Sequence, residues 1–110
     1  CLVVGPSADA VLVALPQCHR RPGRGQYDVI VAFCPDRRAL DRHVAGLPAR
    51  LAPKGGLWLA WLKRSSGMPT DIGESDIHVA GLATGLVDNK VAAIDERWSA
   101  FRFVHRRQPR

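Results

Sequence analysis

The sequence predicts an α/β fold, a three-layer sandwich whose sheet is mostly parallel and ends in an antiparallel hairpin. Two observations lead to this prediction. Short apolar runs rich in Val and Leu come first, and a helix-like pattern separates the later ones, which is the order of a parallel sheet. The end of the chain differs, because two strand-like runs flank a short turn, which is typical of an antiparallel hairpin.

Three apolar runs in the first part of the chain are expected to be buried strands. They are CLVVG at 1–5, AVLVALP at 10–16 and YDVIVAFC at 27–34. The third run is continuous and rich in β-branched residues, so we expect it in the centre of the sheet. Pro35 ends this strand, and Asp36 is the expected N-cap of a helix that runs to about Leu51.

This helix is predicted by apolar residues at spacings of four, three and four, namely Leu40, Val44, Leu47 and Leu51. Pro48 lies inside the pattern and has no backbone N–H, so we expect a kink or a restart there. Gly55 and Gly56 are expected to stop the helix before the strand LWLAWL at 57–62. We predict that this strand and the one at 27–34 are adjacent and parallel.

A second helix is expected to run from Thr70 or Asp71, as its cap, to about Gly81, with acidic residues in its first turn. The hairpin is expected to join LVDNKVAAID at 86–95 to WSAFRFVHRR at 98–107. Trp58 and Trp61 are three residues apart in one strand, so they are expected to face opposite sides of the sheet.

The overall composition fits one domain over residues 1–110. The chain begins at Cys1 with an apolar strand, so we expect that an N-terminal segment precedes it in the whole protein. Three cysteines without paired spacing argue against a disulfide framework and favour a reducing, cytoplasmic compartment. No apolar run is long enough to span a bilayer, so we expect no membrane contact, and the oligomeric state stays open.

The net charge of +6 permits binding to a polyanion, although the basic residues fall into separate clusters rather than one stripe. These clusters are Arg20, Arg21 and Arg24; Arg37, Arg38 and Arg42; Lys63 and Arg64; and Arg102, Arg106, Arg107 and Arg110. A solvated basic surface and a nucleic-acid-binding face both fit this distribution.

The segment YDVIVAFCPDRRALDRHVAGLPARLAPKGGLWLAW resembles the second half of class I S-adenosylmethionine (SAM)-dependent methyltransferases, which have a Rossmann-like fold. In that family a strand, a helix, an L-x-P-x-G-G turn and another strand follow in this order, and LAPKGG at 51–56 matches the turn. The resemblance covers roughly residues 27–106 and concerns the fold. It implies a methyltransferase-like sheet whose last strands form the antiparallel hairpin.

Residues 58–103 also resemble an uncharacterised bacterial family, a domain of unknown function. The matching motifs are SG-x-x-TD at 66–71, GL-x-x-GLVD-x-KV at 81–91 and AID-x-x-WS at 93–99. This resemblance implies no established activity.

The methyltransferase pattern is not kept where that family binds its cofactor. The family has a glycine-rich loop after its first strand and a carboxylate after its second. Here the first loop has Gly5 followed by a proline, and the second apolar run ends in ALPQ without an acid. We therefore expect no cofactor, with SAM binding weaker than about 100 μM. A divergent methyltransferase remains an alternative.

Ligands of open parallel sheets bind outside the carboxyl ends of the strands. At this edge the sequence places Gly5, Ser7, Cys34 and Asp36 as a candidate ligand edge. A thiol near a helix N-terminus can act as a nucleophile, but no base for Cys34 can be assigned. A buried structural cysteine fits the same position. No catalytic residue is therefore assigned, and the four scattered histidines show no metal-ligand spacing.

The stretch WLAWLKRSSGMPTDI contains a candidate anion-binding turn. Its residues are Lys63, Arg64, Ser65, Ser66, Gly67 and Thr70. The two basic residues supply charge, while the small residues supply hydroxyl groups and free backbone before a helix N-terminus. Acidic residues crowd the same helix start, however, so an ordinary polar turn is the alternative.

Three classes of function remain from the sequence. The first is a non-catalytic binding or interaction module with an anion site at the strand ends. The second is a nucleic-acid-associated protein that uses its arginine clusters. The third is an enzyme acting on a small anionic or nucleotide substrate, including a divergent SAM-dependent methyltransferase.

Overall fold

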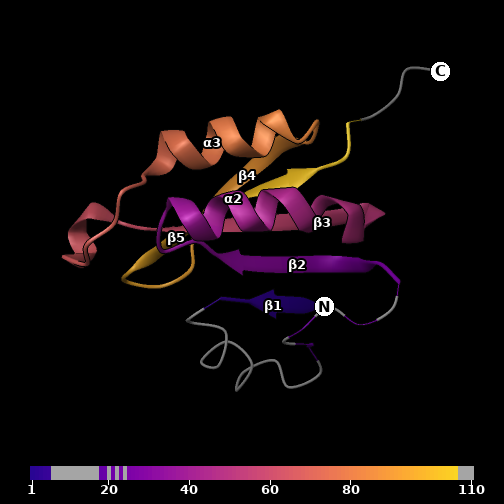
Figure 1. Cartoon of the computed structure of the whole chain (residues 1–110), viewed down its shortest axis with the longest axis horizontal. Helices are drawn as coiled ribbons and strands as arrows, with labels where there is room; N and C mark the ends of the chain where they lie inside the picture. The colour runs from indigo at the N-terminus through magenta and orange to yellow at the C-terminus, as the bar shows by residue number, and fades with distance from the viewer. Residues whose placement is uncertain (6–17, 20, 22, 24, 107–110) are drawn as a thin grey trace.

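A computed structural model describes residues 1–5, 18–19, 21, 23 and 25–106 of the chain. These residues form one five-stranded mixed sheet and two α-helices (Figure 1). The strands are β1 (Leu2–Val4), β2 (Tyr27–Phe33), β3 (Leu51–Leu62), β4 (Val87–Ala93) and β5 (Trp98–Val104), and the helices are α2 (Arg37–Gly46) and α3 (Glu74–Ala83). The strand order is β1-β2-β3-β5-β4. The expected strand at 10–16 lies outside the described residues.

The parallel part of the sheet is formed by β1, β2 and β3, and the hairpin adds β5 antiparallel to β3. The predicted adjacency of the strands at 27–34 and 57–62 is confirmed, because Ile30 lies opposite Leu57 and Phe33 opposite Ala60. The predicted hairpin is also confirmed, with β4 antiparallel to β5. The fold is therefore α/β, with an antiparallel edge on a parallel sheet.

The helix after β2 is shorter than predicted. Asp36 caps it as expected, since its carboxylate accepts a hydrogen bond from the backbone N–H of Ala39 at 2.9 Å. The helix ends at Gly46, and Pro48 then begins a short 3₁₀ helix, which is the predicted restart. The expected helical position of Leu51 is wrong, because Leu51 is the first residue of β3.

The expectation that Gly55 and Gly56 stop the helix is also wrong, because both belong to β3. The pairing is irregular here, since Leu51 lies opposite Tyr27 whereas Gly56 lies opposite Val29. Residues 52–55 therefore stand opposite the single residue Asp28, so the β3 side has three extra residues. Proline cannot donate a ladder hydrogen bond, so Pro53 accounts for a bulge at this point.

The second helix starts later than predicted. It begins at Glu74, and Gly73 is its N-cap, whose backbone N–H donates to the Asp76 carboxylate at 2.9 Å. The expected caps Thr70 and Asp71 instead bond to residues near the start of α2. The reason is a tertiary contact, described below, which local sequence patterns do not reveal.

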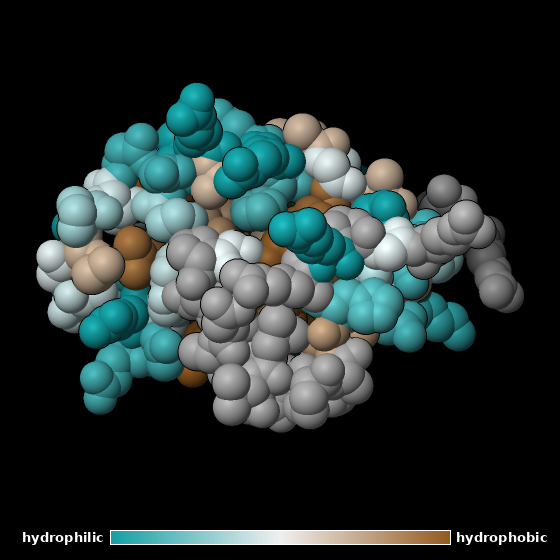
Figure 2. Space-filling model, turned by 60° about the horizontal axis from the view of Figure 1, so that its bottom comes forward, coloured by the Kyte–Doolittle hydropathy of each residue, from teal (hydrophilic) through white to brown (hydrophobic). Residues whose placement is uncertain are grey.

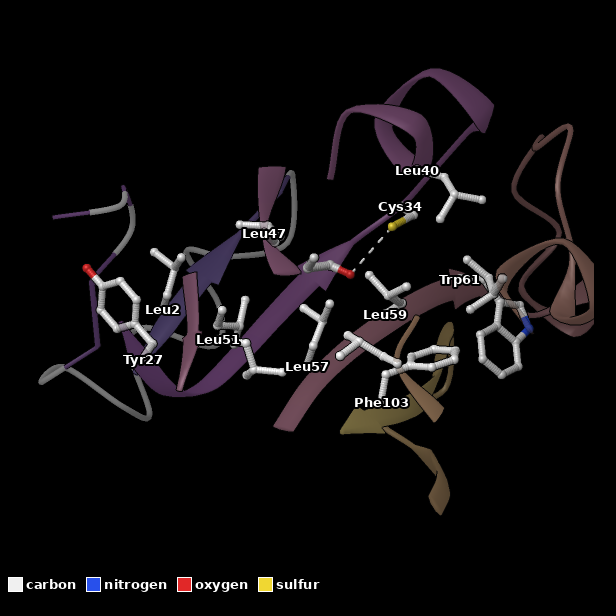
Figure 3. Packing of buried hydrophobic residues seen from close by; sticks show 14 of the residues in the cluster. Leu2, Tyr27, Cys34, Leu40, Leu47, Leu51, Leu57, Leu59, Trp61 and Phe103 are labelled. Atoms are coloured by element: carbon white, nitrogen blue, oxygen red, sulfur yellow. Dashed lines mark hydrogen bonds between the residues drawn. The ribbon is translucent and has the colours of Figure 1, made fainter. Parts of the chain in front are cut away.

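Both described helices pack on one face of the sheet. The larger core cluster lies there and includes Leu40 of α2 and Ile77 of α3 beside strand residues such as Leu59 and Phe103 (Figure 3). The smaller cluster on the other face contains strand residues and Cys18, with no helical residue among those described. Trp61 belongs to the larger cluster and Trp58 packs against the smaller one, so their predicted opposite orientation is confirmed.

A disulfide bond joins Cys1 to Cys18. The expectation of no disulfide, which rested on the absence of paired spacing, is therefore wrong. The two residues meet because residues 18–19 lie beside β1, where His19 pairs in parallel with Leu2. The backbone N–H of His19 also donates to the Cys1 carbonyl oxygen at 2.8 Å. Neither α-helix in the described part of the chain has the length and apolar character needed to cross a membrane.

Candidate functional site

The strand order places a topological switch point between β1 and β2. From β1 the chain reaches His19, which lies on the side of β1 away from β2. From β2 the chain passes through α2 to β3, which lies in the opposite direction. In open α/β sheets, ligands bind at such a point, outside the carboxyl ends of the strands. Of the candidate ligand edge predicted from the sequence, Gly5, Cys34 and Asp36 lie here.

Gly5 follows β1 at this point and comes very close to the end of β2. Its φ is +113°, and a side-chain Cβ at Gly5 would lie 2.7 Å from the carbonyl oxygen of Phe33. An L-residue with a side chain would be strained in this conformation and would also clash. Gly5 therefore allows the carboxyl ends of β1 and β2 to lie against each other.

Cys34 and Asp36 leave β2 at the same edge, and each has a structural role there. Cys34 is fully buried, and burial, with a smaller contribution from Asp36, raises the pKa of its thiol to about 12. Its Sγ lies 3.7 Å from the Ala32 carbonyl and beside Leu40 (Figure 3). Asp36 is occupied in capping α2. Ser7, the remaining residue of this candidate edge, lies outside the described residues.

A cleft of about 950 Å³ opens at the carboxyl end of β3, on the same edge of the sheet. Trp61 and Ile72, both almost completely buried, form part of its apolar lining. The polar lining comes from the segment after β3 and from the first turn of α3. Its volume is within the range of roughly 300–1,000 Å³ that is usual for small-molecule sites.

Four of the six residues of the candidate anion-binding turn line this cleft, namely Lys63, Arg64, Gly67 and Thr70. Ser65 and Ser66 are not part of its lining; they form a short 3₁₀ helix with Arg64, closed by Gly67 at φ +72°. The strand ends at Leu62, so strand alternation does not continue through the two basic residues.

A set of hydrogen bonds ties one wall of the cleft to the start of α2. We call it the clasp, and it consists of Thr70, Asp71, Asp76, Pro35 and Arg37. Thr70 donates to the Pro35 carbonyl at 2.7 Å, and the Asp71 carboxylate accepts from the backbone N–H of Arg37 at 2.7 Å. The Arg37 guanidinium pairs with Asp76 at 2.6 Å.

The clasp explains why α2 and α3 both start with satisfied backbone groups. Asp36 and Asp71 accept N–H groups at the start of α2, and Asp76 accepts the N–H of Gly73 at the start of α3. The pKa of Asp76 is lowered, mainly by the Gly73 N–H and further by Arg37. Local sequence could have suggested Asp76 as a capping residue, but not the contact with α2.

His43 is a polar residue that the sequence does not single out. Its Nε2 is buried and has no hydrogen-bond partner within the described part of the chain. Burial and the nearby Arg42 charge lower its pKa, while the Phe33 backbone opposes this effect. The imidazole is therefore neutral at pH 7. The contact with Phe33 places His43 beside the carboxyl end of β2.

The basic clusters predicted from the sequence belong to different parts of the molecule. Arg37, Arg38 and Arg42 lie on α2, Lys63 and Arg64 lie at the cleft, and Arg102 lies in β5. Arg20, Arg24, Arg107 and Arg110 are outside the described residues. Figure 2 likewise shows hydrophilic groups separated by paler and hydrophobic areas on the visible described surface.

Among solved structures, the chain is similar to several methyltransferases. One is a TehB-like SAM-dependent methyltransferase from Corynebacterium glutamicum, with a TM-score of 0.58, 12% identity and coverage of 96% of this chain and 67% of that chain. Another is a ribosomal-protein methylase from Lactobacillus delbrueckii, with a TM-score of 0.57, 13% identity and coverage of 96% and 58%. An O-methyltransferase of neocarzinostatin biosynthesis gives a TM-score of 0.60 at 9% identity, with coverage of 94% and 41%.

These similarities show that the chain has a methyltransferase-like α/β fold, as the sequence resemblance implied. The chain spans between about two fifths and two thirds of the length of these three proteins. No family model matches the sequence, and no curated protein is similar to it at a significant level.

Proposed function

We propose that the chain is part of a divergent SAM-dependent methyltransferase that binds its cofactor at the switch point and its methyl acceptor in the cleft. One observation carries this proposal: the switch point and the cleft lie at the same carboxyl edge of a methyltransferase-like sheet. A group-transfer enzyme needs its donor and acceptor sites next to each other. The resemblance of residues 58–103 to a domain-of-unknown-function family stays a prediction, because no family model matches the sequence, and it implies no activity that conflicts with this proposal.

The described residues form one part of the surface that would bind SAM. Gly5 lets the backbone after β1 lie close to the backbone at the end of β2. The residues that follow β2 would form the adjacent wall of the cofactor site. A bound SAM would supply an electrophilic methyl group there. Pro35 and Asp36 would position it through backbone and packing, because the Asp36 carboxylate is occupied. Most of the loop after β1 and the ALPQ segment lie outside the described residues.

A non-catalytic binding module is the second candidate, and the clasp favours it. The carboxylates of Asp36, Asp71 and Asp76 each accept a backbone N–H near the start of a helix, which is a structural role. Cys34 is buried and its raised pKa keeps it protonated. Such a module would bind a small anionic ligand at the residues of the candidate anion-binding turn.

Isothermal titration of the chain with SAM and with S-adenosylhomocysteine distinguishes the two candidates. The methyltransferase proposal expects saturable binding below about 100 μM, which corresponds to about −5.5 kcal/mol. Binding of phosphate or nucleotides without binding of either SAM compound would favour the module. A methyl-transfer assay on candidate acceptors follows only if the cofactor binds.

A further inference from the structure

The charged residues that line the cleft differ in whether they are already paired. The ammonium group of Lys63 donates to the Asp95 carbonyl at 2.7 Å. Asp71 and Asp76 are engaged in the clasp. The side chains of Arg64 and Glu74 make no hydrogen bond or ion pair with another residue in the described ranges, and they do not pair with each other. Arg64 and Glu74 are therefore the lining cation and the lining carboxylate whose side chains are without a partner among the described residues.

The overall charge of the lining argues against a simple anion as the occupant. Lys63 and Arg64 are the lining cations, while Asp71, Glu74 and Asp76 supply three carboxylates, of which Asp76 is paired with Arg37. A phosphate or other multiply charged anion would bring further negative charge close to these carboxylates, and like charges repel. A ligand with both an ammonium and a carboxylate group would instead satisfy the two available side chains together.

The remaining lining residues indicate what joins these two charges. Trp61 and Ile72 are apolar and almost completely buried, and Met68 is about half exposed. Small-molecule sites combine such apolar walls with a few polar groups that fix orientation. A compact molecule with an apolar body fits this lining better than a fully polar one.

We propose that the cleft binds a small zwitterion with an apolar side chain, of the class of apolar α-amino acids. Arg64 contacts the carboxylate, and its planar guanidinium suits a two-point hydrogen bond. Glu74 contacts the ammonium group. The inference names the acceptor class of the proposed methyltransferase and rests on that function for its catalytic meaning, whereas binding at the cleft is measured independently of it.

Three probes that share one aromatic ring test the proposal. L-Phenylalanine carries both charges, 3-phenylpropanoate lacks the ammonium group, and 2-phenylethylammonium lacks the carboxylate. Exposed charge pairs contribute modestly, so each missing charge is expected to weaken binding by about three- to fivefold at low salt. Titration of the unmodified chain should therefore rank L-phenylalanine first. Equal binding of 3-phenylpropanoate would overturn the proposal in favour of an anion site, and no binding of L-phenylalanine would overturn it outright.

Two variants assign the charges. Arg64→Gln should abolish the preference for L-phenylalanine over 2-phenylethylammonium, and Glu74→Gln should abolish the preference over 3-phenylpropanoate. The matched controls are Arg38→Gln and Glu96→Gln, which make the same charge changes at exposed residues outside the cleft lining and should leave the ranking intact. Circular dichroism establishes that each variant is folded. An unchanged ranking in the cleft variants would overturn the assignment.

The same titrations separate this inference from the proposed function. L-Phenylalanine is titrated again in the presence of saturating S-adenosylhomocysteine, and it should still bind with the same ranking of the three probes because the two sites differ. Complete competition would mean that the two compounds share one site, which would overturn the assignment of two separate sites. If neither SAM compound binds while the probe ranking holds, the methyltransferase proposal fails and the zwitterion site stands.

Discussion

Replacing Gly81 with alanine tests how closely α3 packs on the sheet. Gly81 is buried, and a Cβ there would lie 2.1 Å from the ring of Phe103, itself fully buried. Alanine favours a helix over glycine by about 1 kcal/mol. Overpacking a core typically costs about 1–3 kcal/mol, so the two effects oppose each other. We expect Gly81→Ala to lose up to about 2 kcal/mol of unfolding free energy.

Gly46→Ala is the matched control, because Gly46 ends the other ten-residue helix and nothing lies within 4 Å of a Cβ there. It gains the helical preference without the clash. The two variants should therefore differ by about 1–3 kcal/mol, or at least about 4 °C in melting temperature. Thermal melts followed by circular dichroism measure this difference. Equal melting temperatures for the two variants would show that α3 does not pack against Phe103 as described.

Three further predictions concern the disulfide, the buried thiol and the clasp. Cys18→Ser should destabilise the oxidised protein by about 3 kcal/mol, which is the usual effect of a disulfide that closes a loop of this length. A reductant should lower the melting temperature of the original chain but not that of the variant. Cys34 should resist Ellman's reagent at pH 8 until the protein unfolds, because its pKa of about 12 and its burial keep it protonated and covered; rapid labelling of folded protein would contradict this. The folded-state pKa of Asp76 lies below its usual 3.8, so its stabilising effect is complete above that pH and is lost as the pH falls through the lowered value. Urea midpoints should therefore fall less between pH 5 and pH 2.5 in Asp76→Asn than in the original chain.

The strands could be predicted from the sequence because their signals are local. A continuous β-branched run predicted β2, and two strand-like runs around a short turn predicted the hairpin. The helix spacing failed at Leu51 for a physical reason. Leu51 points into the same core cluster as Leu40 and Leu47, but it does so from the start of a strand. The spacing of apolar residues predicts which residues face the core, but it does not predict whether they belong to a helix or a strand.

The sequence predicted where the candidate site lies better than it predicted the roles of the individual residues. The segment after β3 was recognised from its composition, and four of its six proposed residues line the cleft. The roles of Thr70 and Asp71 could not be read from neighbouring residues, because their partners lie more than thirty positions away. The same holds for the disulfide, since Cys1 and Cys18 are brought together by strand pairing rather than by spacing.

The clasp also bears on how the two halves of the proposed active site could communicate. Pro35 and Arg37 follow β2 at the switch point, whereas Thr70 and Asp71 line the cleft. A ligand that displaces the 67–73 segment would remove hydrogen-bond partners from the start of α2. Conversely, a ligand that repositions the residues after β2 would alter one wall of the cleft. Coupling between two sites requires such a shared element, and it acts equally in both directions. The clasp connects the residues after β2 to the wall of the cleft, so an effect of cofactor on acceptor affinity should originate there.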